Sequence, residues 1–209
     1  MFVGRKPEQV GNEGVTANDS ETNILMSIDW AQGKVAMKTK KYRDKYMHTI
    51  ATSMRLSESW HGSSRLFGGD SWFAGVKNAI AHRKHGLHFI GDVKGGTAFY
   101  PKKMLTDWTP ATHGECIIYE TKIDDEILYA IGVRRGFMKV RHLIATCCTT
   151  LPAEEQTYVD WGPDGDKRVV VRHKRVHADF IWSSMQPATD VHNKIRQKGL
   201  AVEKVNRFS

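Results

Sequence analysis

Asp70 is the residue of this sequence whose surroundings most suggest chemistry. It stands in the stretch RLFGGDSWFAGV (65–76), between a short apolar run and a segment with the period of an amphipathic helix. Two interpretations are open. Asp70 or Ser71 can cap the helix by accepting backbone N–H bonds, or Asp70 can lie at the tip of a strand, where α/β sheets gather catalytic and ligand-binding groups.

Asp190 is a second acid in a comparable position. It follows Pro187 in the stretch PATDVHNKIRQKGL (187–200), where a helix is expected to begin. A helical repeat places Asp190, Asn193 and Gln197 on one face of that helix. The same two interpretations, helix cap or ligand, apply to Asp190.

Basic residues gather in several places and suit phosphate groups. The chain holds 31 Lys and Arg residues against 23 Asp and Glu residues, so its formal net charge is +8 at pH 7. Such a charge favours a polyanion such as DNA or RNA, although a solvated surface is the common alternative. The residues that we expect to contact DNA phosphates are Lys94, Arg172, Lys174, Arg175, Lys194, Arg196 and Lys198.

The histidine and cysteine residues do not form a recognisable metal motif. His82, His85 and His88 are three residues apart, but a glycine is expected to end the helix before His88. The three cysteines, Cys116 and the pair 147–148, are odd in number and contain no C-x-x-C spacing. This pattern argues against a disulfide framework, and we expect the adjacent pair, which lies in an apolar strand, in the core.

Composition indicates an ordinary globular chain of 209 residues, with 40% apolar and 26% charged residues. The sequence contains no run of about 18 apolar residues, and its first residues lack the apolar core of a signal peptide. We therefore expect an intracellular, soluble protein with no membrane partner and no small-molecule substrate.

The hydrophobic pattern predicts an α/β fold with a mixed sheet. A strand at 64–67, a helix from Ser71 to Gly86 and a strand at 87–93 predict a βαβ unit, which requires a parallel pair. Residues 1–18 are expected to be loose, and residues 31–48 form a loop or a short helix. The other predicted elements are strands at 22–30 and 50–56, an antiparallel meander at 115–121, 126–133 and 139–149, a strand at 168–176, and a helix at 177–197 broken near Pro187.

The order of these motifs resembles that of piggyBac-type transposases, in the branch of the piggyBac transposable element-derived proteins. The heart of that family is an apolar run, an Asp followed by aromatic residues, a helix, and a strand that ends near Gly-x-Val-Lys. Asp70–Phe73, Gly91–Lys94 and Pro101 are similar to this pattern. The segment ATDVHNKIRQKGLAVEK resembles a later block with Asp190, and RKPEQVG…NDSETNIL resembles an earlier block with Asp19.

The resemblance implies a ribonuclease H-like mixed sheet with flanking helices at 19–200, followed by a tail at 201–209. In it Asp19, Asp70 and Asp190 would hold two Mg²⁺ ions, which clamp the attacking and leaving oxygens during DNA strand cleavage and transfer. It also implies a nuclear location and leaves dimerisation unknown.

Departures from the family pattern predict a truncated, incomplete core with weak or lost activity. The segment before Asp19 is polar, and Asn193 stands where many relatives carry a further acid. Two alternatives are a non-catalytic DNA-binding protein derived from a transposase, and a remnant without a selected role.

Overall fold

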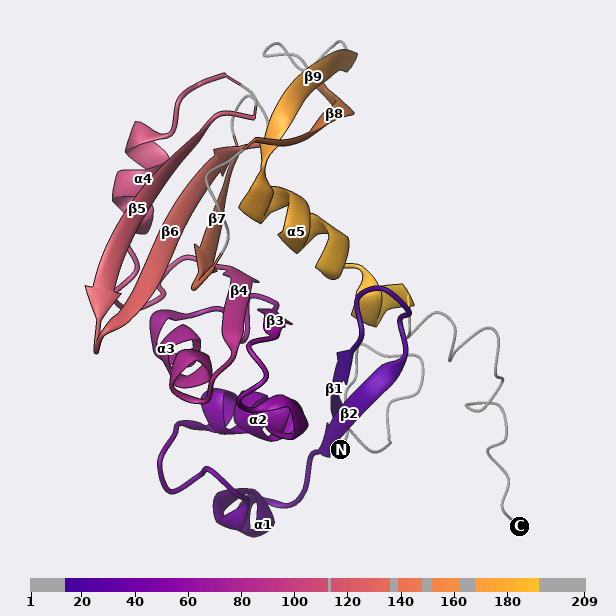
Figure 1. Ribbon diagram of the computed structural model, residues 1–209, viewed down its shortest axis with the longest axis vertical. Helices are drawn as coiled ribbons and strands as arrows, with labels where there is room; N and C mark the ends of the chain where they lie inside the picture. The colour runs from indigo at the N-terminus through magenta and orange to yellow at the C-terminus, as the bar shows by residue number, and fades with distance from the viewer. Residues whose placement is uncertain (1–13, 113, 136–138, 148–151, 162–167, 192–209) are drawn as a thin grey trace. The chain divides into compact units, whose positions relative to one another are not determined.

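The computed structural model describes residues 14–112, 114–135, 139–147, 152–161 and 168–191, with the backbone alone at 152–161 and 168–176. The chain divides into two compact units (Figure 1). The second unit spans Trp60–Ser184, and the first is built from the segments before and after it.

A five-stranded mixed sheet forms the centre of the second unit, as the sequence predicted. Its strands, in spatial order, are β3 (Leu66–Gly69), β4 (His88–Asp92), β7 (Val140–Ala145), β6 (Glu126–Arg134) and β5 (Cys116–Ile123). β3 and β4 are parallel, and the remaining neighbours are antiparallel. The predicted parallel pair and the predicted meander are both confirmed.

Two helices cover one face of this sheet. They are α3 (Val76–Lys84) and α4 (Lys102–Trp108). Phe89 on β4 and Ile144 on β7 are buried there together with Ala79 of α3 and Leu105 of α4. The predicted helix therefore exists, but it begins at Val76 rather than Ser71.

The helix α5 (His177–Met185) is fixed to the opposite face (Figure 1). Side chains alternate along a strand, so Arg141 points away from the face on which Ile144 packs. Its guanidinium donates to the fully buried carboxylate of Asp179, with Nη1 3.2 Å from Oδ1. Arg135 donates to Ser183 one turn further along α5. The positive charge of the arginines compensates the buried carboxylate.

A separate hairpin completes the second unit. It consists of β8 (Pro152–Trp161) and β9 (Arg168–Val176), which pair in antiparallel fashion. β9 was predicted and β8 was not. The turn expected around 162–167 lies outside the described residues.

The first unit contains a two-stranded sheet and two helices. β1 (Gly14–Asn18) pairs with β2 (Leu25–Trp30), followed by α1 (Lys34–Thr39), α2 (His48–Ser57) and a 3-10 helix, η1 (Glu58–Trp60). β1 lies at the end of the segment that we expected to be loose. Asp29 on β2 accepts hydrogen bonds from Arg55 of α2 and from Lys40, so this ion pair ties α2 to the hairpin.

The strand predicted at 50–56 is wrong, because these residues belong to α2. The β-branched residues Ile50 and Thr52 favour a strand locally. The four consecutive residues 51–54 are all buried, so the segment lacks the alternation of buried and exposed side chains that a half-buried strand shows. Tertiary burial therefore decided the structure against local preference.

Candidate functional site

Asp70 lies directly after the carboxyl end of β3, where its side chain is exposed. Its Oδ1 accepts a hydrogen bond from the Trp72 N–H at 2.9 Å. Its carbonyl oxygen accepts bonds from Phe73 and Ala74. The N-cap of α3 is Gly75. Asp70 thus closes a separate turn between β3 and α3, and does not cap the helix itself.

Two glycines hold this turn against the sheet. Gly69 on β3 and Gly91 on β4 are paired in register. A Cβ on Gly69 would lie 2.8 Å from the Phe73 Cβ, and one on Gly91 would lie 2.5 Å from the Gly69 carbonyl oxygen. Only glycine allows this close approach, and the glycines therefore fix the position of Asp70 at the strand end.

Asp92 occupies the corresponding position on the neighbouring strand, and sequence reasoning missed it. It follows Gly91 as Asp70 follows Gly69 on the parallel partner. Burial raises the pKa of Asp92, and the positive charge of Arg141 opposes that shift. The Arg141 Nε is 3.7 Å from Asp92 Oδ2. The sequence did contain a clue to Asp92, because it directly follows the second predicted strand of a parallel pair. Parallel strands bring their carboxyl ends to one edge of a sheet.

Asp19 lies in the turn between β1 and β2 of the first unit, and it is engaged there. Its Oδ2 accepts hydrogen bonds from the Glu21 N–H at 3.2 Å, the Thr22 N–H at 2.7 Å and the Thr22 hydroxyl at 2.6 Å. This is the pattern by which an aspartate shapes its own turn. Three donors occupy Oδ2, so a metal ion would have to bind Asp19 through its other oxygen, Oδ1.

Asp190, also in the first unit, is exposed in a short helical turn after Pro187. That turn is closed by the Val191 N–H, which donates to the Pro187 carbonyl. The preceding residue, Thr189, accepts a hydrogen bond at 3.0 Å from the side-chain amide of Asn18. The structure therefore brings the neighbours of Asp19 and Asp190 into contact. Asp70 belongs to the other unit, and the meeting of all three carboxylates stays a prediction.

Asp19, Asp70 and Asp190 differ in how well their carboxylates could bind Mg²⁺. Asp70 and Asp190 present exposed carboxylates, which are the ligands that hard divalent cations prefer. Asp19 fits less well because of its three donors. Within the described ranges, no group of three or more His, Cys, Asp or Glu side chains is arranged to hold a metal ion.

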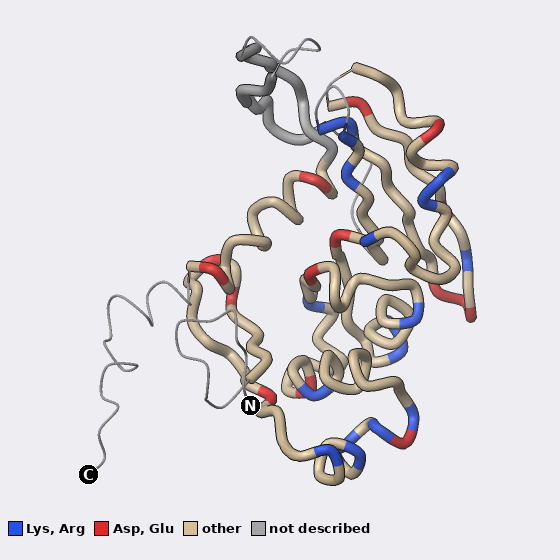
Figure 2. The backbone as a smooth tube through the Cα atoms, turned by 180° about the vertical axis from the view of Figure 1, so that it is seen from behind, with Lys and Arg blue, Asp and Glu red and all other residues tan. Residues whose placement is uncertain are grey.

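The predicted phosphate contacts are only partly covered by the structure. Lys94 is exposed in the loop after β4. Arg172, Lys174 and Arg175 lie on β9, where the backbone alone is described, and Lys194, Arg196 and Lys198 lie outside the described residues. Lys and Arg residues also occur along α3 and the strands β5 to β7 (Figure 2).

His82 is a core residue, in agreement with the weak metal motif. Its ring is fully buried between Phe67 and Phe89, with centroid distances of 5.0 and 4.9 Å. Its Nδ1 is 2.9 Å from the Asn78 carbonyl oxygen. Burial lowers the pKa of His82 to about 4. His82 therefore stays neutral and packs as an aromatic group.

Cys147 differs from the expectation, because it is only half-buried and does not lie in the core. Cys116 is half-buried as well. Cys148 lies outside the described residues.

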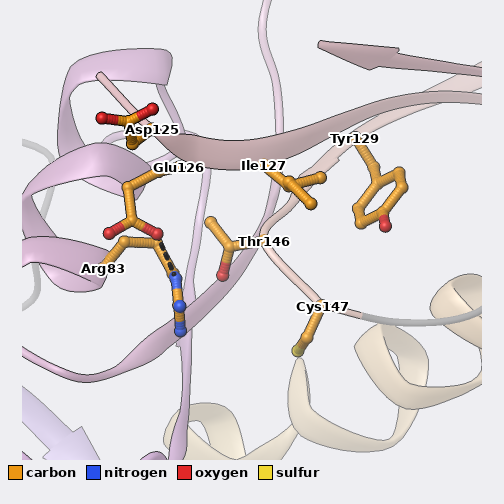
Figure 3. A pocket seen from close by; sticks show the side chains of 7 residues that line it. All are labelled: Arg83, Asp125, Glu126, Ile127, Tyr129, Thr146 and Cys147. Atoms are coloured by element: carbon orange, nitrogen blue, oxygen red, sulfur yellow. Dashed lines mark hydrogen bonds and ion pairs between the residues drawn. The ribbon is translucent and has the colours of Figure 1, made fainter. Parts of the chain in front are cut away.

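A pocket of about 330 Å³ lies beside α3 and the start of β6 (Figure 3). Arg83 and Glu126 line it, and they pair with each other at 2.9 Å. Thr146 and Cys147 lie on its other side. The guanidinium is already paired with Glu126, and Asp125 adds a second carboxylate to the lining, so the pocket offers no unpaired positive charge to an anionic ligand.

None of the helices in the described part of the chain has the length and apolar character needed to cross a membrane.

Comparison with known proteins gives one informative likeness. No family model matches the sequence, and no curated protein matches it. The fold is similar to a cryo-EM structure of a piggyBac transposase synaptic complex with hairpin DNA, with a TM-score of 0.66 and 15% sequence identity. The match covers 94% of this chain and 36% of that transposase chain. The chain thus has a mixed α/β fold of the ribonuclease H-like type, similar to part of that transposase chain.

Proposed function

We propose that this chain is a DNA-binding domain derived from a piggyBac-type transposase, with residual or lost DNA strand cleavage and transfer. The observation that carries the proposal is Asp70 at the carboxyl end of β3, in a fold similar to that of a transposase. Strand ends are where such sheets hold catalytic groups.

Asp19, Asp70 and Asp190 are the proposed ligands of two Mg²⁺ ions. When bound, the ions would stabilise the charge that develops on the attacking and leaving oxygens of a phosphodiester. Asp70 and Asp190 have exposed carboxylates available for this role. Three donors already bind Asp19 Oδ2, which leaves only its other oxygen for a metal ion. This reduced capacity supports weak activity.

DNA is the proposed partner, in keeping with the formal charge of +8. Lys94 is exposed two residues after Asp92 and can reach a phosphate near the strand ends. The other proposed contacts are Arg172, Lys174, Arg175, Lys194, Arg196 and Lys198. The proposed nuclear location rests on the resemblance to piggyBac-type transposases alone.

The test is Mg²⁺-dependent nicking of supercoiled duplex DNA by the full chain. Asp70→Asn removes the negative charge but keeps an oxygen that can accept the Trp72 N–H bond, so the turn survives. Asp107→Asn is the matched control, because Asp107 is an exposed acid on α4 of the same unit. We expect nicking to be lost in the first variant and retained in the second.

A non-catalytic DNA-binding role is the second candidate, favoured by the engagement of Asp19. It predicts duplex binding that weakens steeply with salt, no cleavage, and no change in binding on Asp70→Asn. Absence of duplex binding at low salt would contradict both candidates.

A further inference from the structure

We propose that the outer edge of β5 is a self-association site, where a second copy of this chain adds its own β5 in antiparallel fashion. The two strands meet about a two-fold axis at Thr121, and two five-stranded sheets become one continuous sheet. The site lies at the opposite edge of the sheet from β3 and Asp70. The inference is therefore independent of the proposed function.

β5 is the last strand of the five-stranded sheet, and among the described strands only β6 pairs with it (Figure 1). The eight residues of Cys116–Ile123 keep one register with β6, without a bulge, and they include no proline. Bulges, prolines and very short strands are devices that keep the edge of a sheet from pairing with another chain. The opposite edge strand, β3, has only four residues. β5 thus offers a long and regular row of backbone donors and acceptors to a further strand.

The charged side chains of β5 are complementary to themselves. In an antiparallel pair centred on Thr121, Glu120 of one copy lies opposite Lys122 of the other. The two-fold axis produces this ion pair twice, and opposite charges at facing positions stabilise a strand pair. Both side chains are exposed. A register centred on Glu120 or on Lys122 would instead set like charges against each other. Charge complementarity therefore selects Thr121 as the centre.

Within one copy, Lys122 has only an exposed carboxylate beside it. Its Nζ lies 2.9 Å from Asp125 Oδ1, and the two side chains are 62% and 95% exposed. Exposed ion pairs contribute little to stability, so the lysine can turn to Glu120 of the second copy at little cost. A lysine on an edge strand commonly opposes association, but here the second copy supplies the carboxylate that matches it.

The other face of β5 gives an apolar contact. Tyr119 and Ile123 pack against the core on the side of the sheet that α4 covers. In the proposed register Tyr119 of one copy lies opposite Ile123 of the other, and aromatic and β-branched side chains form favourable cross-strand pairs. Trp108 of α4 is 58% exposed, and its ring centroid lies 5.9 Å from that of Tyr119. An exposed aromatic ring therefore borders the edge at which the second copy docks.

The test is a charge exchange between two variants of the full chain, measured by sedimentation velocity. We expect the parent chain to change from monomer to dimer as its concentration rises through the micromolar range. Glu120→Lys places like positive charges at both facing positions, and Lys122→Glu places like negative charges there. Each variant alone is expected to associate about tenfold more weakly or worse. An equimolar mixture of the two restores opposite charges and is expected to form a mixed dimer.

Two further variants make the result specific. The double variant Glu120→Lys/Lys122→Glu exchanges the two charges within one chain and is expected to associate as the parent does. Lys38→Glu is the matched control, because it makes the same change in net charge at an exposed lysine of α1 in the first unit. It is expected to leave association unchanged.

A parent chain that stays monomeric over this concentration range would overturn the inference. Dimers that both single variants retain, or a mixture of the two that fails to associate, would overturn it as well. The proposed function would survive each of these results, because DNA binding and nicking are measured separately and depend on other residues.

Discussion

In the first unit, the turn after β1 is built around the side chain of Asp19, which accepts three hydrogen bonds on one oxygen. In the second unit, the Asp70 side chain accepts one hydrogen bond, from the Trp72 N–H, and the turn after β3 is held mainly by backbone bonds and by the close packing at Gly69 and Gly91. The first turn uses its carboxylate as a structural part. The second positions a carboxylate with other groups, which leaves it available to a ligand.

The largest expected effect concerns the close packing of glycines that holds the turn after β3. Gly91→Ala would place a methyl group 2.5 Å from a backbone carbonyl and 2.8 Å from the Ala74 Cβ. Backbone atoms cannot move aside easily, so we expect the free energy of unfolding to fall by about 3 kcal/mol, measured by urea denaturation. Gly33→Ala is the control, because nothing lies within 4 Å of its added Cβ. Equal effects of the two substitutions would contradict this account of the turn.

The two units are also expected to respond differently to acid. His82 is buried in the second unit with its pKa lowered from 6.5 to about 4. Below pH 6.5 the unfolded chain takes up a proton that the folded unit excludes, so stability that is complete above pH 6.5 is lost as the pH falls toward 4. The gap corresponds to about 3 kcal/mol.

In the first unit the titratable group to compare with His82 is an acid, Asp29, whose charged form is stabilised by folding. Burial alone would raise the pKa of Asp29, but hydrogen bonds from Arg55 and Lys40 lower it overall below 3.8. Its stabilising contribution is present above pH 3.8 and is lost only below it. The protection factors from amide hydrogen exchange, which correct for the pH dependence of the chemical exchange rate, should therefore fall in β3 and β4 between pH 7 and 4.5 before they fall in β2 and α2. Burial also lowers the pKa of His142 on β7 to about 4, so His82→Phe should remove only part of this fall. An equal fall in both units would contradict the assignment.

The elements that sequence predicted well are those with a clear period. The alternation of Leu87, Phe89 and Val93 and the glycine after α3 were sufficient for the βαβ unit. α2 was mistaken for a strand because Ile50 and Thr52 carry a local β preference that burial overrode. Pattern is informative where local preference and burial agree, and it misleads where they compete.

The candidate site was predictable in residue type but not in the state of each residue. The position of Asp70 at a strand end follows from the pattern. The engagement of Asp19 depends on which donors its turn directs at the carboxylate. This engagement arises from three-dimensional geometry, and no spacing in the sequence encodes it.

The smallest expected effect tests the comparison of the two turns directly. Asp19→Ala removes the acceptor of three hydrogen bonds and should lower the free energy of unfolding by about 1–2 kcal/mol, as the loss of a helix cap does. Asp70→Ala removes the acceptor of the Trp72 N–H bond and should lower it by about 0.5–1 kcal/mol. Urea denaturation of both variants measures the difference.

The free energy of unfolding of Asp19→Asn should lie between that of Asp19→Ala and that of the parent chain, because the amide oxygen can still accept from Thr22. If Asp70→Ala proved the more destabilising of the two alanine variants, the second turn would depend on its carboxylate as much as the first. Asp70 would then have a structural reason for its position, and the argument that it is held available for a ligand would fail.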